Sequence, residues 1–536
     1  MFAIYGKTIA DFFKNFFGFS RTAKKIIAIA CTVCCLVTAY PSYSAEKIRF
    51  NYGLLDFKVE LSDLEYFIET GSIPQRLNFY LRRIAPDKRE TLRDFLKASY
   101  DVNPWLAYRF SRTSVGEKML DRMGDFIQIP ENINGFYGIR AAILKTVTAE
   151  DANNILNLLR NFPTDIKLNL GELLELIRDI NNTEQASKDL VTALSKKNTV
   201  NNSQDNFQDL TSLGEYQVQK ETFEFYDAER DRGLVSDLYL PQIQQRIPLV
   251  VVSNGLGAKR TRFAELANYL ASYGFAVVVP EHPGSNYQRQ REFIKGLHQE
   301  NFAASDYIER PRDISFLLDR LSVVNEQEFN SLLDTNNVGI FGYSIGGTTA
   351  LSLTGAKLDF ERLQEHCDRT LDLTNISILY QCRALEIEPQ TYDLEDSRIK
   401  AAYLFVPFGN SLFDPETVND IDTPMLWQVV DKDFLTSLVS EQIPLYQNLG
   451  SSDRYLAVTE NLPHSTAILS KERSLQQQDQ SRIGRKYQNI ISLVFFDRHL
   501  KSQPNYSSYL SQNYLQTIAE AQYRLYLTKD LPPTDE

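Results

Sequence analysis

One serine of this chain lies in a setting that could make it a nucleophile. The pentapeptide Gly342-Tyr343-Ser344-Ile345-Gly346 follows an apolar run at 338–341, typical of a short buried strand, and precedes a segment at 347–353 that can begin a helix. A Gly-x-Ser-x-Gly turn between strand and helix is so sharp that the serine hydroxyl is lifted clear of the sheet. The two glycines leave room for the strand and the helix to pass closely. The pattern therefore predicts Ser344 as an attacking group.

A serine hydroxyl needs a base to take its proton, and the chain has only five histidines. In the α/β-hydrolase fold, of which this turn is typical, the partners follow the serine in the order acid, then histidine. Two histidines precede Ser344, a third lies in a polar segment before the next strand, and the last lies in a helix-like segment. These four are His282, His298, His366 and His499. His464 follows an apolar strand-like run at 455–460 and is predicted to be the base.

The acid should orient the imidazole and hold it in the correct tautomer. Residues 423–430 read as a buried strand that ends in two carboxylates, Asp431 and Asp433. Many hydrolases carry their catalytic aspartate nine residues after the proline of a similar strand, and counting from Pro424 gives Asp433. Asp431 stays the near alternative.

The negative oxygen that forms when a serine attacks a carbonyl needs two backbone N–H donors. One donor should come from Ile345, the residue after the serine. The other should come from the loop 254–257, which follows a predicted strand at 248–253 and contains two glycines. Leu256 is the first choice in that loop.

About half of the chain, residues 222–500, resembles the α/β-hydrolase group that contains dienelactone hydrolase-like and platelet-activating-factor acetylhydrolase-like proteins. Besides the serine turn, the matching pieces are Asp227-Ala228-Glu229-Arg230-Asp231-Arg232, Ser253-Asn254-Gly255-Leu256-Gly257, Pro280-Glu281-His282-Pro283-Gly284-Ser285 and Arg310-Pro311-Arg312-Asp313. The resemblance implies a doubly wound, mostly parallel sheet. Dienelactone hydrolase itself has a cysteine nucleophile, whereas this chain has Ser344. The acetylhydrolases carry their acid one strand earlier, but the strand at 401–406 has no aspartate at its end.

Residues 46–200 resemble the N-terminal domain of a cyanobacterial α/β-hydrolase family of unknown function. The stretches that carry this resemblance are 63–71, 134–142 and 159–164. Apolar residues recur with helical spacing, as in Leu173-Leu174-Glu175-Leu176-Ile177, so we expect a helical accessory domain. The polar residues 201–215 should be a linker, and 216–536 the hydrolase domain. Residues 356–398 lengthen one connection and are predicted to form a cap near the pocket.

Residues 1–45 have the pattern of a signal peptide, which predicts a periplasmic or secreted protein. Basic residues precede a 15-residue apolar run, which is short for a membrane span, and small residues follow it. A retained membrane anchor is the alternative. The rest of the chain carries 52 basic and 68 acidic residues, a net charge of −16, which argues against a nucleic-acid partner.

The cysteines and histidines predict a disulfide and no metal site. Three of the five cysteines lie in the leader, so Cys367 and Cys382 could pair in an oxidising compartment. No Cys/His spacing suggests a metal, and the chemistry needs no cofactor.

These observations favour an exported serine hydrolase of carboxylic esters, with acetyl or lipid-like esters as candidate substrates. Two alternatives stay open. One is a catalytically silent binding or scaffold protein on a hydrolase frame, and the other is an amidase or peptidase that uses the same residues. The sequence does not predict the oligomeric state.

Overall fold

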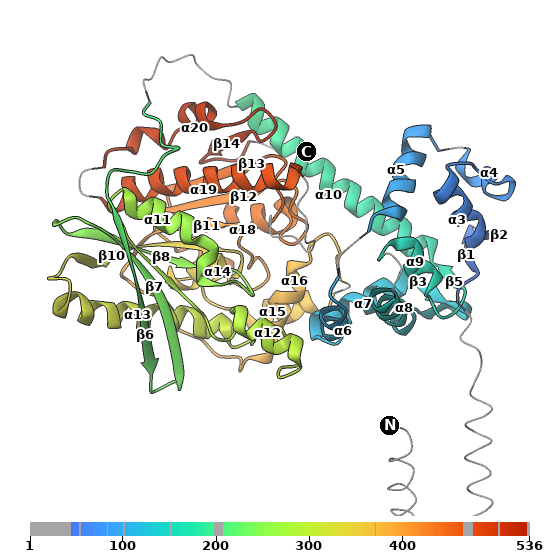
Figure 1. Ribbon diagram of the computed structural model, residues 1–536, viewed down its shortest axis with the longest axis horizontal. Coiled ribbons are helices and arrows are strands. Elements are labelled where there is room, and N and C mark those ends of the chain that lie inside the picture. Colours follow the sequence, from blue (N-terminus) through green and yellow to red (C-terminus); the bar gives the residue numbers. More distant parts are fainter. Residues whose placement is uncertain are drawn as a thin grey trace, which may run out of the picture.

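The protein is described by a computed structural model that covers residues 44–52, 55–82, 84–99, 102–149, 153–197, 207–369, 371–464, 475–501 and 504–532. The predicted signal peptide lies almost entirely outside these ranges. Figure 1 shows a small N-terminal domain and a larger domain built on a twisted sheet, with the long helix α10 (Leu170–Lys197) running from one to the other. No helix in the described ranges is long and apolar enough to cross a membrane.

The N-terminal domain contains a small mixed sheet as well as helices. Its strands are β1 (Lys47–Tyr52), β2 (Leu55–Glu60), β3 (Ile127–Ile129), β4 (Ile133–Asn134) and β5 (Ile166–Leu168). Its helices before α10 are α3 (Leu61–Thr70), α4 (Gln75–Leu81), α5 (Pro86–Lys97), α6 (Pro104–Phe110), α7 (Ser114–Phe126), α8 (Phe136–Thr148) and α9 (Ile155–Arg160), with a 3-10 turn η1 (Pro130–Asn132).

The sheet of this domain is an addition to the helical accessory domain expected from the sequence. Its strand order among the described residues is β2-β1-β5-β3-β4, so β1 pairs with β5, more than a hundred residues further along the chain. Three of the five strands are only two or three residues long. Such short strands carry no readable alternation of apolar and polar residues, and their pairing is set by distant partners.

The large domain is built on a nine-stranded sheet of order β14-β13-β12-β11-β10-β8-β9-β7-β6. Its strands are β6 (Val218–Asp227), β7 (Arg232–Pro241), β8 (Ile247–Ser253), β9 (Ala276–Pro280), β10 (Leu333–Tyr343), β11 (Ile399–Phe405), β12 (Met425–Val430), β13 (Arg454–Thr459) and β14 (Leu525–Thr528). The strands from β13 to β9 in this order run parallel, while β14, β7 and β6 are antiparallel to their neighbours. The arrangement confirms the predicted mostly parallel sheet.

Helices cover both faces of this sheet. The remaining helices are α11 (Ala264–Ser272), α12 (Tyr287–Lys295), α13 (Asp306–Gln327), α14 (Ile345–Leu353), α15 (Phe360–Cys367), α16 (Ser377–Gln381), α17 (Pro415–Asn419), α18 (Ile443–Gln447), α19 (Leu475–Leu500) and α20 (Gln512–Ile518). Short turns are η2 (Arg260–Phe263), η3 (Cys382–Glu386), η4 (Leu438–Gln442) and η5 (Ser507–Tyr509).

Alternate residues of β8 show how the two faces are filled. Leu249 and Val251 join a core with α13, α14 and α18, whereas Val250 and Val252 join a second core with α11, α19 and α20. In Figure 1, α13 and α19 accordingly lie on opposite sides of the sheet. A strand buried on both faces has no polar side, which is why β8 reads as a continuous apolar run.

Helix α10 belongs to both domains. Its first half contacts the N-terminal domain, where Arg122 on α7 pairs with Glu172 at 2.6 Å. Its second half buries Leu190 and Leu194 in one core of the large domain. The predicted linker is also partly packed in its described portion, because Leu210 is fully buried and its carbonyl accepts a hydrogen bond from the Tyr269 hydroxyl at 2.6 Å.

The predicted cap between 356 and 398 contains α15, α16 and η3. A disulfide joins Cys367, at the end of α15, to Cys382, at the start of η3, with 5.8 Å between their Cα atoms. This confirms the predicted pairing. The cross-link closes a short loop that carries α16.

Candidate active site

Ser344 lies in a strained turn between β10 and α14. Its backbone has φ 55° and ψ −121°, a conformation that is costly for a residue with a Cβ. The flanking glycines are needed for steric reasons. A Cβ on Gly342 would lie 2.3 Å from the carbonyl oxygen of Gly346, and a Cβ on Gly346 would lie 2.0 Å from that of Ser253.

The three residues predicted as nucleophile, base and acid lie together, although they come from three different strand ends. His464 Nε2 is 3.2 Å from Ser344 Oγ, and His464 Nδ1 is 2.7 Å from Asp433 Oδ2. His464 and Asp433 are 6% and 7% exposed. An ionised Asp433 accepts the Nδ1–H, which leaves the lone pair of Nε2 facing the serine hydroxyl. This tautomer is the one that a general base needs.

Asp433 is held by four hydrogen bonds in total. Besides the His464 ring, the backbone N–H groups of Leu435 and Thr436 donate to Oδ1, both at 2.9 Å, and the Thr436 hydroxyl donates to Oδ2 at 2.6 Å. The sequence reasoning missed Thr436. Its signal was present, because an aspartate followed three residues later by threonine often forms such a local turn.

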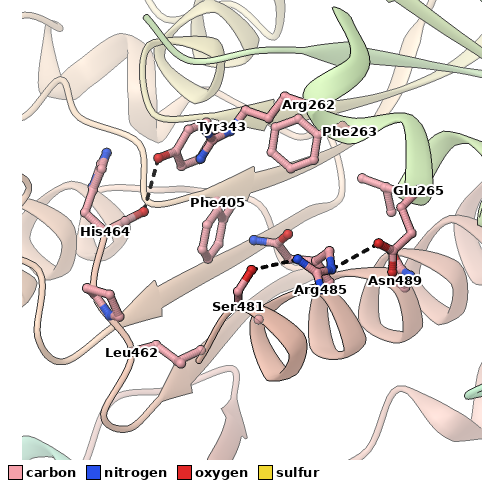
Figure 2. A pocket seen from close by; sticks show the side chains of 14 residues that line it. Arg262, Phe263, Glu265, Tyr343, Phe405, Leu462, His464, Ser481, Arg485 and Asn489 are labelled. Atoms are coloured by element: carbon pink, nitrogen blue, oxygen red, sulfur yellow. Dashed lines mark hydrogen bonds and ion pairs between the residues drawn. The ribbon is translucent and has the colours of Figure 1, made fainter. Parts of the chain in front are cut away.

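Asp431, the alternative acid, does not contact the histidine. Its Oδ1 accepts the backbone N–H of Asn461 at 2.6 Å, which ties the end of β12 to the loop that carries His464. Burial raises the pKa of Asp431. The Tyr343 hydroxyl supports the same loop by donating to the carbonyl of His464 at 3.2 Å, as Figure 2 shows.

The two predicted oxyanion donors both lie near Ser344. Ile345 is the first residue of α14, and the first N–H groups of a helix have no partner within it. Leu256 lies in the loop after β8 and lines the same cavity as Ser344 and His464. Gly255 allows the loop to approach this closely, because a Cβ there would lie 2.7 Å from the ring of Tyr343.

The cavity beside Ser344 has a volume of about 390 Å³. Most of its lining side chains are either apolar, such as Phe408 and Leu435, or carry an amide or hydroxyl group, such as Gln290. The cap contributes Ser377 and Tyr380 from α16, which places it at the pocket as predicted.

A smaller cavity of about 180 Å³ lies next to it and shares Arg262, Tyr343 and His464 in its lining (Figure 2). Its far wall is held by Arg485, which pairs with Glu265 at 3.0 Å.

The N-terminal domain supports the larger cavity from outside. Arg109 on α6 donates hydrogen bonds to the carbonyl of Phe293, at 3.2 Å, and to the carbonyl of His298. These bonds hold the end of α12, and this helix also carries Gln290 of the cavity lining. The backbone N–H of Ser114 donates to Glu300 at 2.8 Å. Among the described residues, the N-terminal domain contributes no side chain to the cavity lining.

The other four histidines lie away from Ser344. His298 pairs with Glu292 at 3.0 Å, and His366 bonds the Ser411 hydroxyl at 2.7 Å. Burial lowers the pKa of His499 to about 4. His282 belongs to a separate buried network. In the described part of the chain, no group of three or more histidine, cysteine or acidic residues could hold a metal ion.

The sheet order, the strained serine after a central strand and the partners after later strands define the α/β-hydrolase fold. Comparison with protein families agrees. Residues 44–169 match the family described as an alpha/beta hydrolase of unknown function (DUF1400), and residues 235–304 match platelet-activating factor acetylhydrolase, isoform II. These matches confirm the resemblance to the α/β-hydrolase group and support a hydrolase. No curated protein matches the chain.

Proposed function

We propose that the protein is a serine hydrolase of carboxylic esters. The observation that supports this most is the contact of Ser344 Oγ with His464 Nε2 at 3.2 Å, beside a cavity and with Asp433 on the other ring nitrogen. A protein that only binds its ligand has no need of a base within reach of a strained serine.

In the proposed mechanism Ser344 Oγ attacks the ester carbonyl while its proton moves to His464 Nε2. The N–H groups of Ile345 and Leu256 bind the negative oxygen of the tetrahedral intermediate. His464 then gives its proton to the departing alkoxide, which leaves an acyl-enzyme. A water molecule attacks the acyl-enzyme as His464 takes its proton, and collapse releases the acid and restores the serine.

We propose acetyl or lipid-like esters as the substrate class. The mostly apolar lining of the cavity favours an acyl or alkyl group over a charged one. The family that residues 235–304 match is named as an acetylhydrolase. The disulfide between Cys367 and Cys382 supports the proposed periplasmic or secreted location, because disulfides persist in oxidising compartments.

The test is hydrolysis of p-nitrophenyl esters of increasing chain length, beside the matching anilides, by the full chain without its leader. Ser344→Ala should lower kcat about 10⁴-fold or more, since the loss of one triad member removes the nucleophilic route. Ser352→Ala is a matched control in the same helix, because its hydroxyl bonds only the helix backbone, and it should change kcat less than about twofold. Hydrolysis by Ser344→Ala at the wild-type rate would refute the mechanism. A preference for anilides would instead identify an amidase.

A further inference from the structure

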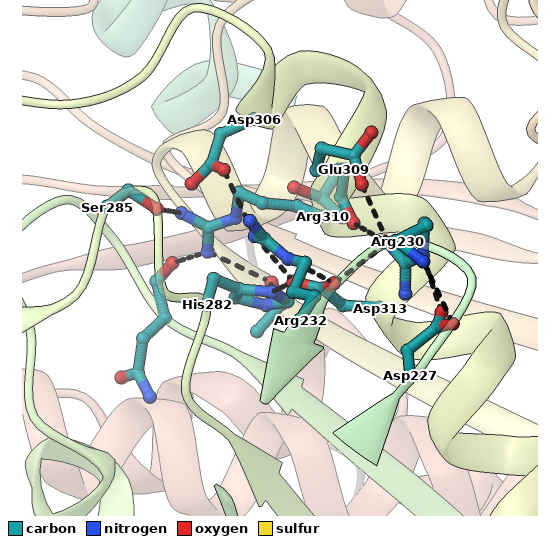
Figure 3. A network of polar contacts seen from close by, with 12 residues as sticks. Asp227, Arg230, Arg232, His282, Ser285, Asp306, Glu309, Arg310 and Asp313 are labelled. Carbon is teal, nitrogen blue, oxygen red and sulfur yellow. Dashed lines mark hydrogen bonds and ion pairs between the residues drawn. The ribbon is translucent and has the colours of Figure 1, made fainter. Parts of the chain in front are cut away.

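A second constellation of charged side chains contacts the loop 254–257 through Arg310, and Figure 3 shows its members. Its innermost members are Arg232, His282, Asp306, Arg310 and Asp313. Arg310 is 1% exposed, and Asp306 and Asp313 are fully buried. None of the five belongs to the described lining of the cavity beside Ser344.

Part of this network repeats the spacing of the active site. Ser253 Oγ is 3.2 Å from His282 Nε2, and His282 Nδ1 is 3.0 Å from Asp313 Oδ2. Ser253 is fully buried and His282 is 3% exposed, so no substrate reaches them. Burial, together with the charge of Arg310, lowers the pKa of His282 to about 4, so the ring is neutral at pH 7. The arrangement is therefore structural, and its protons can be assigned.

Asp313 is ionised, because the hydrogen bonds from His282 and Arg232 outweigh its burial and lower its pKa. It therefore accepts the Nδ1–H of His282. The free Nε2 of the ring then accepts the hydroxyl proton of Ser253. The Ser253 oxygen in turn accepts a hydrogen bond from Arg310 Nη2 at 3.2 Å. Every hydrogen bond in the series Asp313–His282–Ser253–Arg310 has one donor and one acceptor, and together they orient the Arg310 guanidinium.

The oriented guanidinium holds the loop on both sides of Leu256. Arg310 Nη2 donates to the carbonyl of Asn254, two residues before Leu256. Arg310 Nη1 donates to the hydroxyl of Ser285 at 3.1 Å, and the carbonyl of Ser285 accepts the backbone N–H of Gly257 at 2.7 Å, one residue after Leu256. The peptide that carries the Leu256 N–H therefore lies between two hydrogen-bonded points, at Asn254 and at Gly257, and both are linked to the Arg310 side chain.

The type of residue at 310 fits this role. Burying a cation is costly, and the carboxylates of Asp306 and Asp313 offset part of that cost by Coulomb attraction. No carboxylate in the described structure pairs directly with Arg310; its hydrogen bonds go to a backbone carbonyl and two hydroxyls. An apolar side chain would fill the same space without the desolvation cost but could not hold the loop.

We propose that Arg310 is a positioning residue that sets the Leu256 N–H at the oxyanion site. The inference rests on the proposed function. A donor of this kind must lie about 2.7–3.1 Å from the developing oxyanion, and the loss of one costs about 10²–10³-fold in kcat. Displacing Leu256 should therefore affect the transition state and leave ground-state binding nearly unchanged.

The test compares Arg310→Lys with Arg230→Lys in the full chain without its leader. Lysine keeps the charge but cannot reach three acceptors with a planar fork. Arg230 is the matched control, since it belongs to the same network through Asp227, Glu309 and Asp313 but makes no contact with the loop.

The readouts are kcat and KM on p-nitrophenyl acetate and the affinity for an alkyl trifluoromethyl ketone, which forms an oxyanion on the serine. The matching methyl ketone reports ground-state binding. Arg310→Lys should lower kcat and trifluoromethyl ketone affinity by the same factor, about 10²-fold, with KM and methyl ketone affinity within about threefold. Arg230→Lys should stay within about threefold in all four quantities. Equal effects of the two variants, or unchanged trifluoromethyl ketone affinity in Arg310→Lys, would overturn the proposal.

If Arg310→Lys fails to fold, Ser285→Ala decides the question. It removes the acceptor of Arg310 Nη1 and keeps the Ser285 carbonyl. A parallel loss of about threefold to tenfold in kcat and in trifluoromethyl ketone affinity supports the proposal, and no loss refutes it. Labelling of the wild type by a fluorophosphonate distinguishes a failure of the proposed serine-hydrolase function from a failure of the Arg310 proposal. Absence of labelling at Ser344 contradicts the proposed function. If Ser344 is labelled but the variants do not differ as expected, only the role of Arg310 is contradicted.

Discussion

Replacing Asp433 by asparagine should disable the site through the proton of His464. Asp433 Oδ2 accepts from the His464 ring and the Thr436 hydroxyl, while Oδ1 accepts two backbone N–H groups at 2.9 Å. An amide has only one oxygen. If that oxygen faces the ring, the NH₂ group meets two backbone donors and both hydrogen bonds are lost. The opposite orientation is therefore favoured, and it places the NH₂ group against Nδ1.

In that orientation the imidazole must change tautomer, since Nδ1 has to accept from the amide. The ring proton then sits on Nε2, which is 3.2 Å from Ser344 Oγ, and the base cannot take the serine proton. A wrong tautomer of this kind costs about 10⁴-fold in kcat, or about 5.5 kcal/mol of activation free energy. The fold should be retained, because the two side chains have the same shape.

Asp431→Asn is the matched control, two residues away on the same strand end. Its amide oxygen can still accept the backbone N–H of Asn461, so kcat should change less than about twofold. The assay is kcat/KM on p-nitrophenyl acetate together with the rate of fluorophosphonate labelling. If Asp431→Asn is the more damaging change, or if the two variants are alike, the assignment of Asp433 as the orienting acid is wrong.

Two further predictions concern acid stability and the N-terminal domain. His282 is protonated near pH 6.5 in the unfolded chain but only near pH 4 in the folded chain, so the unfolded state binds more protons between these values, and the free energy of unfolding should fall by about 3 kcal/mol as the pH drops through this window. When the free energy of unfolding is measured in urea from pH 7 to pH 4.5, it should fall less steeply in His282→Gln than in the wild type, and identical slopes would contradict this. Arg109→Ala should raise KM for longer esters about threefold to tenfold and leave kcat on p-nitrophenyl acetate within about twofold, because it removes the hydrogen bond to α12 but leaves the triad intact. A loss of kcat on every ester would mean that the N-terminal domain is needed for chemistry.

The residues of the site could be predicted where their signals are local or follow the chain order of the fold. The turn around Ser344 is specified by two glycines that steric contact requires. Elimination among the histidines selected the one that contacts Ser344, because the order of partners along the chain is a property of the topology. Asp433 and Asp431 could be separated only by counting residues from Pro424, and the structure separates them by direct contact with His464.

Other features depend on partners that the sequence places far apart. In the N-terminal sheet, β1 pairs with β5 across more than a hundred residues, and the three strands β3, β4 and β5 are too short to show a pattern. The Arg310 network was visible only as separate motifs in the resemblance, since its members come from β7, β8, the loop after β9 and α13. The packing of Leu210 and of the second half of α10 could not be predicted for the same reason, because the sequence of a polar or amphipathic segment does not show which surface the segment will contact.

Helix α10 has a consequence for how the protein is made. Its Leu194 is fully buried, and its neighbour Lys197 donates to the carbonyl of Asp530, just beyond the last strand of the sheet. Ribosomes add about 5–20 residues per second, so the second half of this helix leaves the ribosome roughly tens of seconds before η4 and β14, which contact it in the folded protein. During synthesis the N-terminal domain can fold while Leu190 and Leu194 stay exposed to the solvent. The nascent chain therefore exposes an apolar helix face for most of its synthesis, and chaperones that bind exposed apolar segments should bind to the second half of α10.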